Sequence, residues 1–202
     1  MSTNAKSSIL TAAQFLFGEK GFEGTSIRDI SKRAKVNVAM IAYYFDCKER
    51  LYTHCLQEYA SSKSAKVQSI LTAPKSLADF ELKLRHLLEA LMDSFDQDAP
   101  MLKIFLREIQ TDKKKINRDL VEVTSHFFAM IRDFFQASMD GKIISDQQSA
   151  DLLTIIFLGA MSEPVRCEFT MKRIMGVTLH DKEFQKNYKE HLLKIFINGV
   201  VQ

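Results

Sequence analysis

The side chains best suited to do chemistry in this chain lie in one short segment, residues 38–44, and the chemistry that they offer is non-covalent contact. The segment reads VAMIAYY and carries no charge. Tyrosine hydroxyls such as those of Tyr43 and Tyr44 can bond phosphate oxygens, and small apolar groups can contact thymine methyls. Because exposed tyrosine, methionine and valine side chains do not favour solubility, their gathering here indicates a surface made for a partner.

The residue types that perform covalent or metal chemistry show no useful spacing. The five histidines form neither an HxxxH pattern nor a His–Asp–Ser arrangement, and the three cysteines include no CxxC pair. Neither a catalytic site nor a zinc site nor a disulfide framework is indicated. We therefore expect no enzyme activity, no metal and no cofactor. Cys47, close to the segment, leaves two alternatives open, a redox sensor or an inert, partly buried thiol.

Charge is unevenly distributed along the chain. Of the 202 residues, 46% are hydrophobic and 26% are charged, which is ordinary for a globular protein and too apolar for a disordered one. Residues 1–50 hold eight basic and five acidic side chains, while residues 51–202 hold twenty of each sign. The net charge of +3 therefore comes from the N-terminal quarter. Unless this is a chance fluctuation, it indicates an anionic partner for that part alone.

No segment is typical of a membrane protein or a secreted protein. The longest nearly continuous apolar run, Leu152 to Met161, is about half the length needed to span a bilayer. No signal peptide is indicated at the N-terminus, because Glu19 and Lys20 directly follow the first apolar stretch. We expect a cytoplasmic protein with no membrane partner.

Helical periodicity fills the long stretches between the three prolines, and clear period-2 alternation is absent, so we predict an all-α fold. The first helix should stop at Gly21, Ser76 should cap the fifth, and Pro100 should open the sixth. An eighth helix should begin after Ser145 and be interrupted at Pro164. The second helix should lie between a cap at Thr25 or Ser26 and a break at Lys35-Val36. The other expected helices cover approximately residues 6–20, 38–44, 46–70, 77–96, 100–110, 116–139 and 182–198.

Two of these helices meet at a tight break and form a helix-turn-helix unit. Thr25 or Ser26 can cap the first of them, and Asn37 can cap the second. With Ile41 directed inward, the second helix should protrude as a unit, which is the geometry needed to enter a major groove. A small core, backed by the first helix of the chain, can hold the pair together: Ile30, Ala34, Val36 and Ile41.

The stretch from Ala13 to Leu51 resembles the N-terminal domain of the tetracycline-repressor (TetR) family. The family often has glycine at the turn, where this chain has Lys35, so the turn must tolerate a side chain or use another geometry. Many members also have tyrosine at the position of Ala42. The residues that carry the resemblance are Phe17, Gly21-Phe22, Thr25-Ser26-Ile27, Ile30, Val36-Asn37, Tyr43-Tyr44-Phe45, Lys48 and Leu51.

The resemblance implies a DNA-binding domain at residues 1–50 and a helical ligand-binding and dimerisation domain at residues 51–202. The second helix of the unit would read a groove, while helix N-termini and basic side chains would bind phosphate. The residues that we expect to contact DNA are Thr25, Ser26, Arg28, Lys35, Asn37, Val38, Ala39, Met40, Tyr43, Tyr44 and Lys48.

The expected helix at residues 116–139 has an apolar surface that covers roughly half of its circumference. A helix packed against one layer needs a narrower stripe, so we predict that this helix is surrounded on several sides. Central helices of the resembling family enclose a small-molecule pocket, which implies a small hydrophobic or aromatic effector, although such side chains more often form core than pocket. The candidate ligand-binding residues are Met92, Phe95, Phe105, Phe127, Met130, Ile131, Phe134, Phe157 and Met161.

The last two long helices carry more apolar surface than one small bundle can bury. The run from Leu152 to Met161 is apolar nearly all round, and the final helix places Ile195 and Phe196 on an apolar face. A two-fold homodimer through these helices would cover the remaining patch, as the resemblance also implies. The alternative is that the first of the two helices is simply central in the fold.

Together these features predict a ligand-responsive transcriptional regulator. As a repressor, it would bind a palindromic DNA operator as a dimer and be released by its effector. Two alternatives stay open, a transcriptional activator and a ligand-independent architectural DNA-binding protein. The sequence identifies neither the operator, nor the regulated genes, nor the effector.

Overall fold

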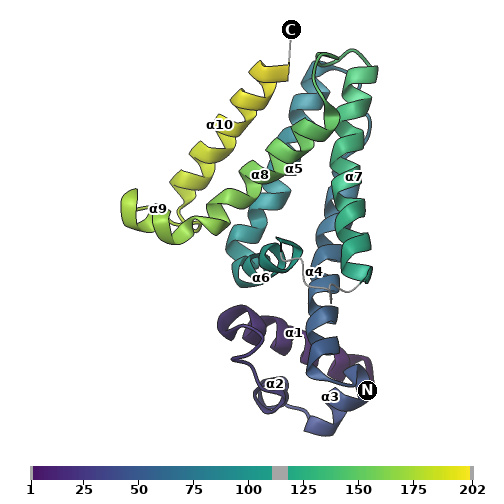
Figure 1. The fold of residues 1–202 in the computed structure, drawn as a ribbon, viewed down its shortest axis with the longest axis vertical. Helices are drawn as coiled ribbons and strands as arrows, with labels where there is room; N and C mark the ends of the chain where they lie inside the picture. Colours follow the sequence, from purple (N-terminus) through teal and green to yellow (C-terminus); the bar gives the residue numbers. More distant parts are fainter. Residues whose placement is uncertain (1, 111–117, 201–202) are drawn as a thin grey trace. The chain divides into compact units, whose positions relative to one another are not determined.

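The computed structural model describes residues 2–110 and 118–200. Within these ranges the chain forms ten α-helices and no strand, so the predicted all-α fold is confirmed (Figure 1). No helix of this part of the chain is both long and apolar enough to cross a bilayer. The helices are α1 Ser2–Lys20, α2 Ile27–Ala34, α3 Val38–Phe45, α4 Lys48–Ile70, α5 Leu77–Gln97, α6 Ala99–Gln110, α7 Arg118–Asp140, α8 Ala150–Arg166, α9 Glu168–Ile174 and α10 Lys182–Val200.

By contacts, the chain divides into two compact units. The first comprises Met1–Ser62 and Ala99–Val123, and the second comprises Lys63–Asp98 and Thr124–Gln202. Helix α6 therefore packs with α1–α3 and the first part of α4. The functional division between residues 1–50 and 51–202 stays a prediction, because packing alone assigns no role to either part.

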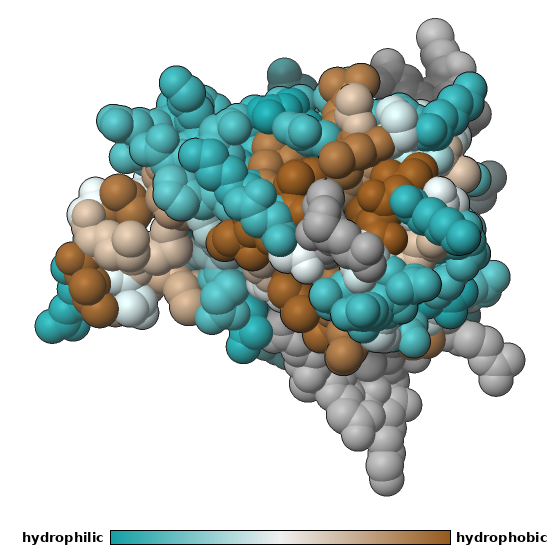
Figure 2. Space-filling view, turned by 90° about the horizontal axis from the view of Figure 1, so that it is seen from above, coloured by the Kyte–Doolittle hydropathy of each residue, from teal (hydrophilic) through white to brown (hydrophobic). Residues whose placement is uncertain are grey.

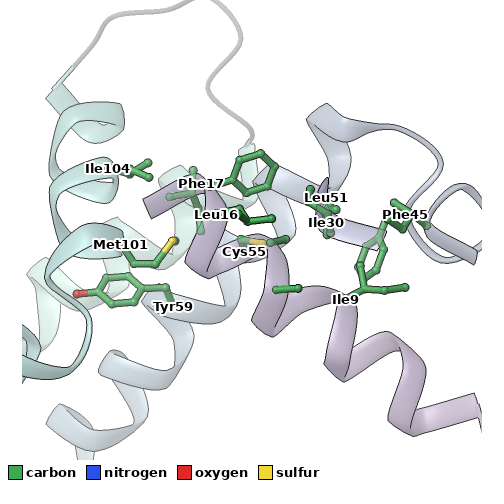
Figure 3. Close-up of a cluster of buried hydrophobic side chains, with 14 of the residues drawn as sticks. Ile9, Leu16, Phe17, Ile30, Phe45, Leu51, Cys55, Tyr59, Met101 and Ile104 are labelled. Carbon is green, nitrogen blue, oxygen red and sulfur yellow. The ribbon is translucent and has the colours of Figure 1, made fainter. Parts of the chain in front are cut away.

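The core of the first unit is built by side chains that converge from six helices, α1–α4, α6 and the start of α7. Figure 3 shows Ile9 of α1 beside Phe45 of α3 and Phe17 of α1 towards Leu51 of α4, with Ile104 of α6 in the same cluster. Burial of a large apolar side chain stabilises a fold by about 1.5–3 kcal/mol. The apolar face that periodicity predicts for α1 is buried along its length, which confirms it: Ile9, Ala12, Ala13, Leu16 and Phe17.

Helix α6 crosses α1 at close range because a glycine stands at the crossing. A Cβ atom added to Gly18 would lie 2.5 Å from the Cβ of Pro100, closer than two such atoms can approach. Glycine inside a helix normally destabilises it by about 1 kcal/mol relative to alanine. At Gly18 that cost is offset by the close packing of α6 that only glycine permits.

Helix α6 is also joined to α4 through side chains. The Tyr52 hydroxyl donates a hydrogen bond to Glu108 Oε1 at 3.1 Å, and the rings of Tyr59 and Phe105 lie 5.6 Å apart. Burial, and then the nearby Glu108 carboxylate, raise the pKa of Tyr52 above its ordinary value. Tyr52 therefore stays a neutral donor, and α1, α4 and α6 form one packed set.

In the second unit, α8 and α10 both pack against α5 (Figure 1). Two ion pairs join α10 to α5, Arg85 with Glu190 at 2.6 Å and Lys189 with Glu89 at 2.7 Å. Phenylalanine rings with centroids 5.3–6.4 Å from their neighbours form the centre of the unit: Phe80, Phe134, Phe135, Phe157 and Phe196. Edge-to-face and stacked pairs of aromatic rings stabilise a core beyond the contribution of their buried area.

Helix α8 corrects the expectation of an interruption at Pro164. The helix continues through Pro164 to Arg166. Proline lacks an N–H, so the carbonyl of Ala160, four residues earlier, has no helical donor. The Tyr188 hydroxyl of α10 donates to this carbonyl at 2.6 Å. A contact from another helix therefore satisfies the group that proline leaves open.

Two further expectations about the second unit need correction. Helix α8 begins at Ala150, capped by the Ser149 side chain, several residues later than the periodicity indicated. Helix α7 is not surrounded on several sides, because Arg132, Asp133 and Gln136 form an exposed polar side. On its apolar side, Ile131, Phe134 and Phe135 are buried, whereas Phe127 and Met130 are half-buried.

Candidate nucleic-acid interface

The N-terminus of α2 is closed by a reciprocal cap. The backbone N–H of Asp29 donates to the Ser26 hydroxyl at 3.1 Å, and the Asp29 carboxylate accepts from the Ser26 backbone and hydroxyl. These hydrogen bonds hold the pKa of the Asp29 carboxyl below its usual value. The sequence allowed either Thr25 or Ser26 as the cap of α2, and in the structure the cap is Ser26, which is exposed.

Thr25 serves the fold instead. Its side chain is only 1% exposed. The hydroxyl lies 3.0 Å from the carbonyl oxygen of Leu16 and 2.8 Å from that of Gly21, so it donates within the protein. A phosphate contact through this hydroxyl would require these hydrogen bonds to be exchanged. Thr25 ties the start of α2 to the end of α1.

The turn between α2 and α3 keeps the left-handed geometry that glycine usually supplies. Lys35 has φ 56° and ψ 42°. The turn is closed by a hydrogen bond from the Val36 N–H to the Ser31 carbonyl at 3.1 Å. A residue with a Cβ is strained in this region by roughly 1 kcal/mol. Lys35 tolerates the geometry because its side chain is exposed and meets no obstruction from the core.

Helix α3 is anchored on one side and open on the other. The Ala39 N–H donates to Asn37 Oδ1 at 2.9 Å, which confirms the predicted cap. Ile41 and Phe45 are buried in the core of the first unit. Two eight-residue helices are thus held in fixed register by apolar contacts, and one face of α3 remains in solvent.

The exposed face of α3 carries most of the residues that we expect to meet DNA. Tyr43 is 82% exposed, and Val38 and Ala39 are exposed with it. Met40 and Tyr44 are half-buried and pack against the core, with the Tyr44 ring 5.0 Å from that of Tyr43. The structure therefore brings Val38, Ala39 and Tyr43 to the surface and uses Met40 and Tyr44 partly to support it.

The junction of α3 and α4 is a strained turn. Asp46 has φ 67° and ψ −63°, and the Cys47 N–H donates to the Phe45 carbonyl at 2.7 Å. This is a γ-turn of the positive-φ kind, which is rare and unfavourable for a residue with a side chain. The turn lets α4 begin at Lys48, directly after α3 ends.

Basic residues surround this helix-turn-helix. Arg28, Lys35 and Arg50 are exposed, and Lys48 is half-buried at the first position of α4. Sequence reasoning missed Lys6, whose Nζ lies 5.9 Å from the ring centroid of Phe45 and thus beside α3. Lys6 and Phe45 lie far apart in the chain, and only the packing of α1 against α3 brings them together.

Comparison with known proteins assigns the chain to a family. Residues 9–55 match the family model described as bacterial regulatory proteins, tetR family. The chain is 36% identical over 198 residues to the HTH-type transcriptional repressor NicS of Pseudomonas putida, a match that covers 96% of this chain and 92% of NicS. The chain belongs to the TetR family. The HTH-type transcriptional regulator RutR of Escherichia coli is 27% identical over 199 residues, covering 96% of this chain and 90% of RutR.

Solved structures of similar fold support the TetR-family architecture along the whole chain. The regulator FadR of Bacillus subtilis, in complex with stearoyl-CoA, has a TM-score of 0.77 at 14% identity over 96% of this chain and 98% of that one. The fatty acid degradation regulator FadR of Bacillus halodurans has a TM-score of 0.73 at 17% identity over 93% and 97%. These likenesses show the fold and leave the ligand open.

The nine candidate ligand-binding residues lie in different surroundings in this TetR-family chain. Phe105 belongs to the first unit, where it packs on Tyr59. Phe127 and Met130 of the second unit are half-buried. A depression of about 710 Å³ between the end of α7 and the start of α8 is lined mostly by polar residues and by none of the nine. The buried candidates in the second unit are Met92, Phe95, Ile131, Phe134, Phe157 and Met161.

A second exposed surface lies on α8. Leu152, Ile155 and Ile156 are between 55% and 59% exposed, and Gly159 continues their line one turn later. Their spacing of three and four residues places them on one side of the helix. Figure 2, which is seen from above, shows hydrophobic residues at the surface between hydrophilic ones. Some of them lie at the left of the view, the side on which Figure 1 places α9.

The apolar face predicted for the final helix is divided by the fold. Leu192 and Phe196 are buried against the second unit. His191, Ile195 and Gly199 are exposed. The helix therefore has a side that contributes to the core and a side that adds to the uncovered surface.

Proposed function

We propose that this TetR-family protein is a repressor that binds a palindromic DNA operator as a homodimer and is released by a small hydrophobic effector. The observation that carries the proposal is the exposed face of α3. Tyr43 is 82% exposed on a short helix that is capped by Asn37 and anchored by Ile41. Rigid support with an open aromatic and apolar face suits insertion into a major groove.

The contacts follow from the chemistry of each position. The Tyr43 hydroxyl can bond a phosphate oxygen or a base edge, and the Val38 and Ala39 side chains can contact thymine methyls. Exposed cations, Arg28 and Lys35, and the Lys48 ammonium supply attraction to the backbone. Ser26, Asn37, Met40 and Tyr44 complete the proposed surface, whereas Thr25 would take part only through the position that it gives α2.

The dimer would form through the exposed sides of α8 and α10. Three aliphatic side chains on α8 are uncovered, and Ile195 is exposed on α10; exposed apolar surface of this kind marks a protein interface. A two-fold axis presents the same patch from both copies. The two α3 helices would then enter successive major grooves about 34 Å apart, which explains why the operator should be palindromic.

Release by an effector would act through the spacing of the two α3 helices. A ligand held by residues 51–202 shifts the population towards the geometry that it binds better, by no more than its difference in affinity. The phenylalanine and methionine side chains around α5, α7 and α8 favour a hydrophobic compound. The stearoyl-CoA complex of the similarly folded FadR supports an acyl chain as the first compound to try. Such a repressor would act in the cytoplasm, where bacterial DNA lies.

Selection of genomic DNA fragments tests this proposal. Purified protein is mixed with sheared genomic DNA, the bound fragments are sequenced, and an enriched palindrome is expected. Gel shifts then compare this palindrome with a duplex of the same composition in scrambled order. Equal affinity for the two duplexes would contradict a sequence-specific regulator. Titration of the complex with stearoyl-CoA, beside a matched detergent, tests whether an acyl effector releases the DNA.

A further inference from the structure

We propose that Phe22 is a positioning residue for a DNA-phosphate contact made by Lys48. This inference deepens the proposed function and rests on it. Phe22 follows α1 in the chain, and Lys48 is the first residue of α4. The fold brings them together, with the Lys48 Nζ 4.2 Å from the centroid of the Phe22 ring. At this distance an ammonium is attracted by the negative face of an aromatic ring.

Lys48 is available for an external anion. Among the described residues it forms no ion pair, whereas Arg50 pairs with Asp46 at 3.5 Å. Its place is also unfavourable for the helix alone, because the N-terminal end of a helix already carries partial positive charge. A phosphate at this end would interact with the ammonium and with the backbone N–H groups of the first turn together. An anionic partner thus accounts for a cation that α4 itself does not need.

The Phe22 ring is held by two other aromatic rings. It stacks on Phe17 with centroids 6.0 Å apart, and it meets the edge of Tyr52 at 5.0 Å. The Tyr52 hydroxyl is in turn held by Glu108 of α6. Lys48 and Tyr52 are four residues apart on α4, so both side chains lie on the helix face that meets Phe22.

The fixed ring restricts the conformations of the Lys48 side chain before DNA binds. A free lysine side chain loses much rotamer freedom when it is immobilised on a partner. A ring that already holds the ammonium near the helix N-terminus reduces that loss, and the contact gains affinity through pre-organisation. Phe22 would therefore contribute to DNA affinity without touching DNA.

The test measures binding of a random-sequence B-DNA duplex as salt is raised from about 50 to about 200 mM. Phe22→Leu removes the aromatic face and retains apolar bulk. We expect it to weaken binding about three- to tenfold, the range of one cation–π contact. The slope of log K against log salt should fall by about 1 per protomer, as with Lys48→Met. The double variant should bind no more weakly than Lys48→Met alone.

The controls separate the possible failures. Phe15→Leu removes another cation–π partner of this unit, the ring 3.5 Å from the Arg33 guanidinium, and should leave the Lys48 contribution unchanged. Phe22→Tyr keeps the ring and should keep the wild-type slope. Thermal melts report folding, and Phe22→Met gives the same comparison should Phe22→Leu fail to fold.

Three outcomes would overturn the inference while DNA binding stands. The first is an unchanged slope in Lys48→Met, and the second is an unchanged slope in folded Phe22→Leu. The third is full additivity of the two substitutions. If the wild-type protein binds neither this duplex nor genomic fragments, the proposed function itself fails.

Discussion

Helices α3 and α8 both expose apolar side chains, and the chemistry of these side chains differs. On α3 the most exposed large side chain is Tyr43, whose hydroxyl can hydrogen-bond to water. On α8 the exposed side chains are aliphatic, Leu152, Ile155 and Ile156. A tyrosine surface tolerates hydration and can exchange water for phosphate or base edges. An aliphatic surface gains only when water is excluded, at about 25 cal/mol per Å² of buried apolar area.

The comparison shows that exposure alone does not identify a partner. The α3 surface is small, polar at its tip and surrounded by cations such as Lys35 and Arg28. The α8 surface lacks any hydrogen-bonding group along its line of aliphatic side chains. We therefore expect changes on α3 to affect DNA binding alone, and changes on α8 to affect the assembly first and DNA binding as a consequence.

The largest effect should come from a charge on α8. Ile155→Asp places a carboxylate in the proposed interface, where burial without a partner costs several kcal/mol. We expect a monomer by sedimentation equilibrium. Operator binding should weaken by about a hundredfold or more, because a cost of about 2.7 kcal/mol to dimer formation already corresponds to a factor of about a hundred. Leu82→Asp, at a 50% exposed position on α5, is the matched control. A dimer that survives Ile155→Asp would show that α8 is not the interface.

The second largest effect concerns the hydrogen bond that joins Tyr188 of α10 to the Ala160 carbonyl of α8. Tyr188→Phe removes the hydroxyl that satisfies the Ala160 carbonyl opposite Pro164. An unsatisfied carbonyl costs about 1–3 kcal/mol when fully buried, and this contact is part-buried, so the free energy of unfolding should fall by about 1–2 kcal/mol in urea titrations. Restoring the helical N–H with Pro164→Ala in the same chain should recover part of the loss. No recovery would mean that Tyr188 stabilises the protein in another way.

On α3, Tyr43→Ala should weaken operator binding by roughly 1–2 kcal/mol, the scale of one good contact. The oligomeric state and the melting temperature should not change, because Tyr43 contributes little to the core. Fluorescence anisotropy with labelled operator measures the affinity. Tyr43→Phe removes the hydroxyl and keeps the ring, so it should lose only a part of the operator affinity that Tyr43→Ala loses. Wild-type affinity in folded Tyr43→Ala would remove Tyr43 from the DNA surface.

The smallest effect should be a gain in stability at the turn before α3. Lys35→Gly relieves the positive φ of 56° and should raise the free energy of unfolding by about 0.5–1 kcal/mol. The salt dependence of DNA binding should fall at the same time if Lys35 contacts a phosphate. Lys35→Ala, which loses the charge and keeps the strain, separates these effects. A destabilised Lys35→Gly would mean that the lysine stem packs on the fold.

Elements with a strong local signal could be predicted from the sequence. Ser76 and Asn37 cap the helices that they were expected to cap, and α4 ends at Ile70 as periodicity indicated. A cap depends on hydrogen bonds to groups two or three residues away, so it can be recognised within a short window. The signal fails at Pro164, because the donor that replaces its missing N–H comes from Tyr188, in another helix.

The candidate site was only partly predictable for the same reason. Exposure of Tyr43 follows from the anchoring of Ile41, two residues earlier on a short helix. The burial of the Thr25 hydroxyl depends on carbonyls contributed by α1. The contact of Phe22 with Lys48 joins residues that no local pattern relates, and the sequence analysis named Phe22 only among the residues that carry the family resemblance.

By itself the sequence determined where most of the helices form, which side of α1 is buried, and that a capped helix with tyrosines follows a turn at Lys35. These are consequences of periodicity and of hydrogen bonds between near neighbours. Only the tertiary structure decided that Ser26 is the cap in place of Thr25, that α6 packs on α1 at Gly18, and which side of α10 is covered. Such choices depend on contacts between distant segments, whose energies are settled only when the whole fold has formed.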